Sequence, residues 1–298
     1  MKGRKPIDAA PGFCYNTPWE NGFIRSVADT MSTAYVYETH MHTCQASACG
    51  KSPGRDYIQK YIDAGYAGIM ITDHFFRGNC GVDRRLPWRE FVNRFCAGYE
   101  DALNEGEKRG FPVSFGWEEN FDGDEYLIYG LDKAWMIAHP DMPEWTRKQQ
   151  YDIVRAAGGC VVQAHPFRAR SYNHTIYLAH ALCDAVEIYN AGNEPKWNSL
   201  AARYAAVVGL PVTAGSDNHC ADTMRPEKTA GVAFDRPLDS VRDYVAAILE
   251  RRPFGLCLPG PAEEWTEDMT PDLPCRWLDE AGRDSGLDVM DMLRPKRA

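Results

Sequence analysis

The chain has 298 residues, of which 44% are hydrophobic and 25% are charged, the composition of an ordinary soluble globular protein. Its formal net charge of −9 argues against an extended nucleic-acid-binding surface. No apolar run approaches the ~20 residues that a membrane-spanning helix needs, and the basic start resembles no signal peptide. The ten cysteines contain no Cys-x-x-Cys pair, so we expect reduced thiols in a cytoplasmic protein.

Taken in chain order, residues 1–32 show no clear period and are predicted to form an extension packed on the main body. Residues 33–252 then alternate short apolar runs with helical spacing. The predicted strands are 33–37, 67–72, 112–115, 126–129, 160–163, 185–189, 211–214 and 229–234. The predicted helices are 53–64, 88–108, 144–157, 174–182, 196–208 and 238–251. Residues 253–298 are Pro-rich and acidic, and we treat them as a C-terminal appendage.

Repeated strand–helix units predict an α/β fold with a parallel sheet, and this many units favour a closed barrel. No linker and no second alternation pattern divide the region, so a single barrel domain is expected there. Functional residues of such barrels lie at the C-terminal ends of the strands.

The stretch Glu38-Thr39-His40-Met41-His42-Thr43 follows the first predicted strand. Because side-chain direction repeats every second residue along a strand, His40 and His42 should point to the same side. Two adjacent neutral imidazoles provide half of a site for a divalent metal.

Other predicted strand ends carry the same chemistry. The polar side chains expected to converge on one rim are His40, His42, His74, Glu118, His165, Asp217 and His219. Mixed histidine and carboxylate ligands suit Zn²⁺, Mn²⁺ or Fe²⁺, and the pattern does not choose among these ions.

Five motifs resemble those of the PHP (polymerase and histidinol phosphatase) family, in the same order. They are His40-x-His42, Thr72-Asp73-His74, Gly116-x-Glu118, Ala164-His165-Pro166 and Ser216-Asp217-x-His219. The resemblance implies a distorted (β/α)7 TIM-like barrel with two or three divalent metal ions, and a metal-dependent phosphoesterase activity.

The resemblance also implies a ligand set. His40, His42, Glu118 and Asp217 would hold a first metal, while Glu118 would bridge to a second metal bound by His165. His74 and His219 would face a third. Where many members carry a histidine before a later strand, this chain offers Glu125, which can still donate oxygen. Where many carry Asp or His after His-x-His, it offers Cys49, which would bias the third site toward zinc or leave it empty.

Further residues are candidates for substrate binding and proton transfer. Arg168 and Arg170 could supply positive charge to phosphate oxygens, and His174 could line the substrate pocket. His219 or His74 could protonate the leaving oxygen if it is not bound to a metal. Asp73 is expected to orient a metal ligand.

We therefore predict a hydrolase that cleaves phosphoester bonds of a small phosphorylated or nucleotide-like substrate with a metal-activated hydroxide. The alternatives are a metal-dependent hydrolase of an amide or cyclic substrate, and a non-catalytic metal-binding barrel. No membrane partner is expected. The substrate, the metal and the oligomeric state stay open at this stage.

Overall fold

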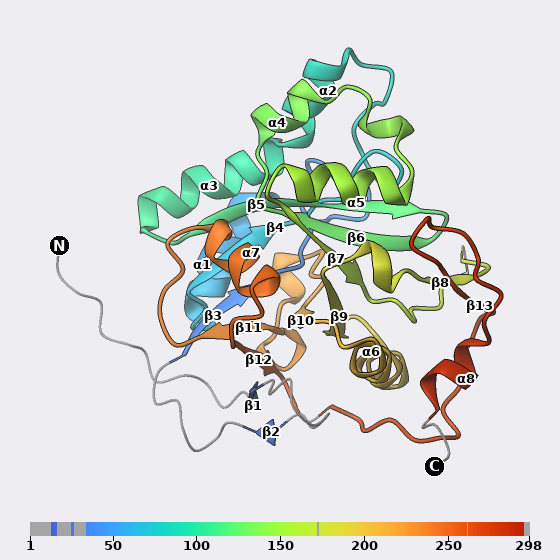
Figure 1. Cartoon of the computed structure of the whole chain (residues 1–298). Helices are drawn as coiled ribbons and strands as arrows, with labels where there is room; N and C mark the ends of the chain where they lie inside the picture. The colour runs from blue at the N-terminus through green and yellow to red at the C-terminus, as the bar shows by residue number, and fades with distance from the viewer. Residues whose placement is uncertain (1–12, 17–24, 27–33, 172, 261, 295–298) are drawn as a thin grey trace.

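The computed structural model describes residues 13–16, 25–26, 34–171, 173–260 and 262–294 (Figure 1). Most of the predicted extension over residues 1–32 therefore lies outside the described residues. The strands are β1 (Phe13–Asn16), β2 (Arg25–Ser26), β3 (Tyr35–Glu38), β4 (Gly68–Ile71), β5 (Val113–Phe121), β6 (Asp124–Tyr129), β7 (Cys160–Ala164), β8 (Ile176–Leu178), β9 (Ala185–Asn190), β10 (Val212–Gly215), β11 (Gly231–Phe234), β12 (Gly255–Leu258) and β13 (Cys275–Trp277). The α-helices are α1 (Gly54–Asp63), α2 (Trp88–Phe95), α3 (Ala97–Arg109), α4 (Lys133–Ala138), α5 (Arg147–Ala156), α6 (Pro195–Val208), α7 (Val241–Leu249) and α8 (Val289–Leu293). Short 3₁₀ helices are η1 (Met142–Glu144), η2 (His180–Leu182), η3 (Ala221–Thr223) and η4 (Pro226–Lys228).

One curved sheet organises the molecule, in the order β10-β9-β7-β6-β5-β4-β3-β11-β12-β1-β2. The end of the sheet at β10 comes back to β3, and the two strands meet through the residues that directly follow each of them. Met41 and Asn218 form a parallel bridge, and the His42 N–H donates to the Asn218 carbonyl at 2.8 Å. The Asp217 N–H likewise donates to the His40 carbonyl at 2.8 Å. The predicted α/β class and barrel-like sheet are confirmed, and the closure lies beside the His-x-His motif.

The expectation of a parallel sheet is wrong at β6 and at β11, which is antiparallel to both β3 and β12. Strand β6 is antiparallel to both β5 and β7, whereas β3, β4 and β5 run parallel, as do β7, β9 and β10. Only Asp122 and Gly123 connect β5 to β6, and a parallel crossover needs a dozen or more residues. Both have positive φ, 56° and 106°, as a tight hairpin turn requires. The start of β6 therefore lies at the same rim as the end of β5.

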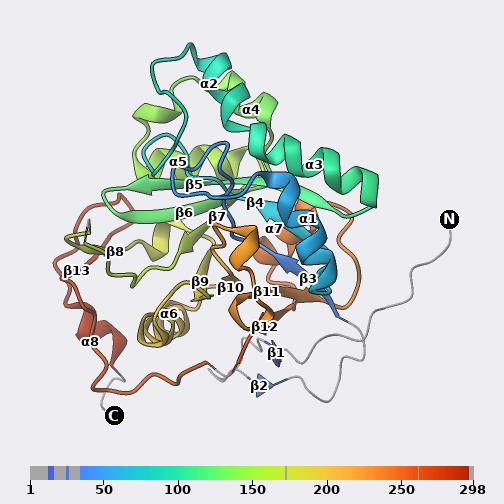
Figure 2. The same ribbon diagram turned by 180° about the vertical axis from the view of Figure 1, so that it is seen from behind.

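Helices cover the outside of this sheet and close its far end. Helices α1 and α3 lie side by side against β4 and β5, while α5 packs on β7 and α6 on β9 (Figure 2). Helix α7 packs where β6 ends, with Tyr244 edge-on to Tyr129 at 5.2 Å between ring centroids. The rim carrying the His-x-His motif lies at the other end of the strands.

Two predicted helices differ from the structure. The predicted helix 88–108 is divided at Cys96 into α2 and α3. The predicted helix 174–182 is wrong: the segment contains β8 and the single turn η2. Strand β8 pairs in parallel with β13 of the C-terminal segment, a distant partner that local spacing does not reveal (Figure 1). Among the described residues, no helix combines the length and apolarity that a membrane crossing requires.

Candidate metal centre

The two histidines of the His-x-His motif are fully buried just beyond β3. Nε2 of His40 lies 3.5 Å and Nε2 of His42 lies 3.0 Å from Oδ1 of Asp217. The same two nitrogens lie 3.3 Å and 3.5 Å from the carboxylate oxygens of Glu118. The strand periodicity argument therefore places these imidazoles correctly, and β5 and β10 bring the carboxylates to them.

A second group of donors also contacts Glu118. Nε2 of His165 is 3.1 Å from Oε1 of Glu118 and 3.6 Å from Oε2 of Glu125. Nδ1 of His74 is 2.7 Å from Oε2 of Glu118. Glu125 reaches this group because β6 runs antiparallel and begins at the rim. Glu118 thus contacts members of both groups.

Several buried polar atoms of these groups have no hydrogen-bond partner. They include Nε2 of His40, Nε2 of His42 and Oε2 of Glu118. Unpaired buried polar atoms are costly, so clustered ones point to a ligand that would satisfy them. Their ligand atoms are close enough to share an ion in the groups His40–His42–Glu118, His40–His165–Asp217, His74–Glu118–Glu125 and His42–His74–His219. The residues present fit divalent metal ions.

The electrostatics of the cluster are those of a site built for positive charge. Burial would raise the pKa of Glu118, but the imidazoles of His40 and His74 hold it well below its usual value. Burial would likewise raise the pKa of Asp217, which Arg168 and His40 keep well below its ordinary range. Both shifts favour the ionised carboxylate, the form that a metal ligand needs.

The backbone is unusual at two of the candidate ligands. His165 and Asp217 have φ values of 28° and 55°, in the left-handed region that L-residues seldom adopt. Such conformations persist where the surroundings enforce them, and they cluster at functional sites.

Glu187 of β9 orients His40. Its Oε1 lies 2.9 Å from Nδ1 of His40, and its Oε2 accepts from the His165 N–H at 3.1 Å and from Nδ2 of Asn190 at 3.0 Å. A carboxylate on one ring nitrogen fixes the tautomer and leaves the other nitrogen free to bind a metal. Sequence reasoning missed Glu187, although a charged residue inside a predicted buried strand was a signal.

Glu38 connects β3 to β10, and its sequence context did not predict this role. It accepts from the backbone N–H groups of His40 and Ser216, each at 2.9 Å, and from the Tyr61 hydroxyl at 2.8 Å. Burial raises the pKa of Glu38 to about 7. This carboxyl group fixes the two chain segments that carry the first group of ligands.

Asp73 contacts no imidazole directly. It accepts from the Thr43 N–H at 2.6 Å, from the Thr43 hydroxyl at 2.7 Å and from the Ser47 hydroxyl at 2.6 Å. Burial raises its pKa to about 6. The Ser47 oxygen lies 3.2 Å from Nδ1 of His42, so the orientation predicted for Asp73 would reach His42 through Ser47.

Arg168 is held against the cluster. It donates to Oδ2 of Asp217 at 2.6 Å and to the side-chain carbonyls of Asn190 and Asn193, each at 2.8 Å. Its side chain is only 10% exposed. Asp217 therefore presents Oδ1 to the histidines and Oδ2 to the arginine.

The structure does not bring Arg170 and His174 into this group. Both are exposed, and the Arg170 guanidinium lies over the Trp197 ring at 5.3 Å. His219 does join the group, because its ring stacks on His42 with centroids 4.3 Å apart. Its side chain is 30% exposed, so it lies at the open side of the cluster.

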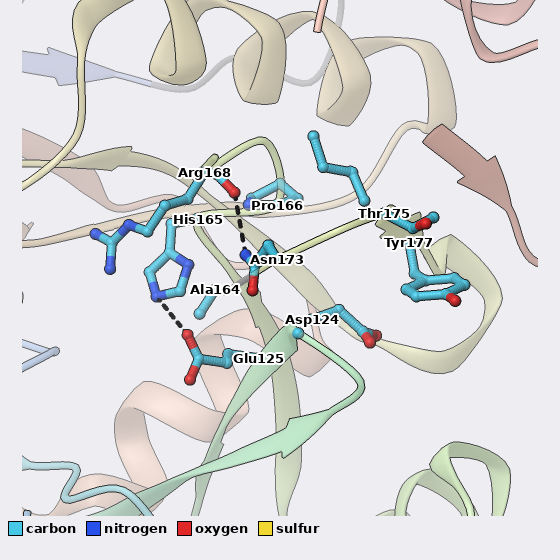
Figure 3. Close-up of a pocket in the computed structure, with 11 residues that line it drawn as sticks. Asp124, Glu125, Ala164, His165, Pro166, Arg168, Asn173, Thr175 and Tyr177 are labelled. Atoms are coloured by element: carbon cyan, nitrogen blue, oxygen red, sulfur yellow. Dashed lines mark hydrogen bonds and ion pairs between the residues drawn. The ribbon is translucent and has the colours of Figure 1, made fainter. Parts of the chain in front are cut away.

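A pocket opens beside the second group of donors (Figure 3). It is lined by Gly123, Asp124, Glu125, Ala164, His165, Pro166, Arg168, Asn173, Thr175, Ile176 and Tyr177. Arg168, His165 and Glu125 form one wall, with Asp124 and Tyr177 farther from them. Asp124 is engaged by Arg147, which leaves Glu125 and Arg168 as the charged groups that a ligand would meet.

Cys49, in the loop after the His-x-His motif, is half-buried. Burial would raise the pKa of its thiol, but hydrogen bonds with His219 and His74 lower it to about 6. Among the described residues, the group of ligand atoms close enough to share an ion there is His42, His74 and His219, and it does not include Cys49.

Fold and ligand cluster together define an α/β barrel protein with a candidate divalent-metal centre at one rim. A family model described as PHP-associated matches residues 195–253, the part of the chain that carries Asp217 and His219. A two-domain protein from Bacteroides vulgatus, described as containing a predicted PHP-like metal-dependent phosphoesterase, has a similar fold. It is 14% identical, with a TM-score of 0.55 over 87% of this chain and 69% of that one. These findings confirm the resemblance to the PHP family.

Two other solved structures are similar over most of their own length. A candidate metal-dependent phosphoesterase from Bifidobacterium adolescentis is 18% identical over 72% of this chain and 96% of that one, with a TM-score of 0.46. An amidohydrolase from Chromobacterium violaceum, with bound sulfate and no metal, is 14% identical over 76% of this chain and 99% of that one, with a TM-score of 0.43. No curated protein matches the chain.

Proposed function

We propose that this protein is a metal-dependent hydrolase that cleaves phosphoester bonds in a small phosphorylated substrate. The observation that carries the proposal is the contact of Glu118 with histidines of both donor groups, beside an arginine that is hydrogen-bonded to Asp217. Zn²⁺, Mn²⁺ or Fe²⁺ bound there would act as Lewis acids toward water and phosphoryl oxygens.

In this proposal the two ions share Glu118 and are otherwise held by different residues. His40, His42, Glu118 and Asp217 would hold a first ion, and Glu118, Glu125 and His165 a second. Glu187 fixes the orientation of His40, so that Nε2 faces the ion. The pocket beside His165 and Glu125 would receive the substrate.

Arg168 is the proposed phosphate-binding group. A guanidinium has five N–H donors. Arg168 makes three hydrogen bonds to protein oxygens, and each uses one of these donors. The remaining donors can bind the non-bridging oxygens of a phosphate, whose geometry matches the guanidinium fork. Asp217, Asn190 and Asn193 hold the group in place before the substrate arrives.

His219 or His74 would deliver the proton to the leaving oxygen. His219 is the more exposed of the two, with a side chain 30% exposed against 11% for His74. Exposure allows His219 to exchange protons with solvent between turnovers.

The proposal is tested with a panel of phosphomonoesters and phosphodiesters on protein loaded with Mn²⁺ or Zn²⁺. We expect Arg168→Ala to lower kcat/KM by about 10²–10³-fold, the usual effect of removing one preorganised donor to the transition state. Arg89→Ala on the exposed surface of α2 is the matched control, expected to act like the wild type. Metal content is measured in every variant, because Arg168 also contacts Asp217. A fully metal-loaded protein that hydrolyses none of the panel would overturn the proposal.

The second candidate is a metal-dependent hydrolase of an amide or cyclic substrate. One observation favours this candidate. Nε and both terminal nitrogens of Arg168 already donate to acceptors within the protein, so the arginine can position Asp217 without binding any phosphate. In that case, Arg168→Ala would lower metal affinity, and amide substrates would be hydrolysed where phosphoesters were not.

A cytoplasmic location stays part of the proposal.

A further inference from the structure

The C-terminal segment, residues 262–294, supplies a strand that pairs with one part of the pocket lining. Strand β8 contributes Ile176 and Tyr177 to the pocket, and it pairs in parallel with β13. Among the described residues, β8 and β13 form a sheet of their own, so β8 has no ladder with the main sheet. Both views show the two strands side by side (Figure 1, Figure 2).

The pairing of β8 with β13 fixes the backbone of the pocket segment. The Ile176 N–H donates to the Pro274 carbonyl at 2.8 Å, and the Leu278 N–H donates to the Leu178 carbonyl at 2.9 Å. In the described part of the chain, β13 is therefore the only strand that supplies backbone hydrogen bonds to β8.

The other edge of β8 is held by one side chain of β7. Nε2 of the buried Gln163 donates to the Tyr177 carbonyl at 2.7 Å, while its Oε1 accepts from the Ala179 N–H at 3.3 Å and from the Tyr204 hydroxyl at 3.1 Å. Gln163 lies two residues before His165, on the strand that leads to this candidate metal ligand. Strand β8 is thus held between the metal-ligand strand and the C-terminal segment.

Trp277 of β13 packs this two-stranded sheet against the core. Its buried ring lies edge-on to Tyr204 at 5.6 Å and 5.0 Å from His180, between ring centroids. Ile176 and Leu178 belong to the same buried cluster. Two strands alone are marginally stable in water, so packing of this kind has to hold the pair in place.

Tyr177 lies on the opposite face of β8 from its two core-facing neighbours, as strand alternation requires. The Arg147 guanidinium lies 4.9 Å from the Tyr177 ring centroid and donates to the two carboxylate oxygens of Asp124 at 2.8 Å and 2.6 Å. Asp124 and Tyr177 line the pocket at a distance from His165 and Arg168 (Figure 3). We call Asp124 and Tyr177 the far wall.

We propose that the C-terminal segment positions the far wall for the leaving alcohol of the substrate, with Trp277 as the positioning residue. This inference rests on the proposed function, in which the phosphoryl group lies beside His165 and Arg168. The esterified alcohol then extends across the pocket to the far wall. Loosening β13 should weaken the binding of the alcohol and leave the metal ligands, which come from other strands, in place.

Steady-state kinetics of Trp277→Ala test the assignment. We expect KM for the best phosphoester of the panel to rise by up to about 10²-fold while kcat stays close to the wild-type value. Inorganic phosphate binds at the metal end of the pocket and does not reach the far wall, so its inhibition constant should not change. Metal content should not change either. An unaltered KM, or an equal rise in KM and in the phosphate inhibition constant, would overturn the proposal.

Two further variants separate positioning from general damage to β13. Trp277→Phe keeps an aromatic ring against Tyr204 and should restore most of the affinity. Arg276→Ala is the matched control on the same strand, because the Arg276 side chain is 56% exposed and pairs with Asp284. A KM in Arg276→Ala as high as in Trp277→Ala would contradict a specific role for the tryptophan.

Hydrogen exchange of the wild type tests the inference without relying on a folded Trp277→Ala protein. If β13 holds β8, the Ile176 and Leu278 amides should be protected and should open together, with equal protection factors. Full protection of Ile176 beside rapid exchange of Leu278 would show that β8 is held without β13 and would refute the assignment. Exchange needs no turnover, so a failed phosphoesterase assay and a failed positioning role remain distinguishable.

Discussion

Glu118 and Glu119 are consecutive residues of β5, equally buried at 1% exposure, yet they lie in opposite surroundings. Glu118 points into the barrel, where imidazoles hold its pKa well below the ordinary value in spite of burial. Glu119 points outward, where it accepts from the Arg77 and Asn120 N–H groups, each at 3.1 Å. Burial raises the pKa of Glu119 to about 7, although Arg77 opposes the shift.

The difference between these two carboxyl groups separates a binding role from a structural one. Oε2 of Glu118 has no hydrogen-bond partner, so this residue has capacity for a ligand. The nearest charged partner of Glu119 is Arg77, whose Nη1 lies 3.7 Å from its Oε2. Burial and charge alone do not distinguish the two carboxyl groups, whereas the unsatisfied oxygen of Glu118, which faces several other donors, does.

The largest expected effect comes from Glu118→Gln. An amide at this position removes the negative charge shared by the two donor groups, so both ions should be held weakly. We expect more than ~100-fold loss of metal-dependent activity and a lower metal content by elemental analysis. Glu119→Gln is the control and should retain both. Equal metal content in the two variants would remove the basis of the comparison.

A smaller effect is expected from Glu187→Gln, which keeps the size of the side chain but weakens the contact with Nδ1 of His40. Loss of such an orienting carboxylate typically costs about 10–100-fold in metal affinity. Competition with a chelator measures the affinity, and urea unfolding without metal measures the stability. A purely structural role for Glu187 would change the second quantity and leave the first unaltered.

The last prediction concerns the pH dependence of stability at Glu119, which points away from the proposed metal ligands. Because its pKa rises from 4.5 to about 7 on folding, its protonated form stabilises the fold. That contribution is fully present below about pH 4.5 and is lost as pH rises through about 7. Glu119→Gln stays neutral. The free energy of unfolding of the wild type should therefore fall relative to the variant by up to roughly 3 kcal/mol over this range.

The measurement is urea unfolding of both proteins at several pH values in the presence of a chelator, so that metal release adds no pH dependence of its own. A constant difference between the two proteins across the range would contradict the prediction.

Local patterns predict the barrel and most of the side chains that converge on the rim, because both depend on the period of the sequence and on where strands end. His40 and His42 follow from strand alternation, and Asp217 from the end of a buried strand. The hairpin that reverses β6 was missed, because a strand has the same local pattern in either direction. Strand β8 was missed because its partner β13 lies far along the chain.

The orienting residues were harder to predict than the ligands. Glu187 and Glu38 act through hydrogen bonds to chain segments that are distant in sequence, and only the folded arrangement shows those partners. Arg168 was predicted as a phosphate ligand, but its contact with Asp217 could not be inferred from spacing. Tertiary contacts decide the surroundings of a polar side chain, whereas the sequence shows only its chemical type.

The two-residue turn between β5 and β6 has a consequence for how such a site can diversify. Glu125 enters the rim only because Asp122 and Gly123 turn the chain back at once, while His40, His42 and Asp217 come from β3 and β10. Insertions or deletions in that hairpin would thus move Glu125 and reshape the adjoining pocket, while the segments that carry His40, His42 and Asp217 would keep their positions. Changes in this hairpin would therefore let related proteins differ in reactivity while they keep the same barrel.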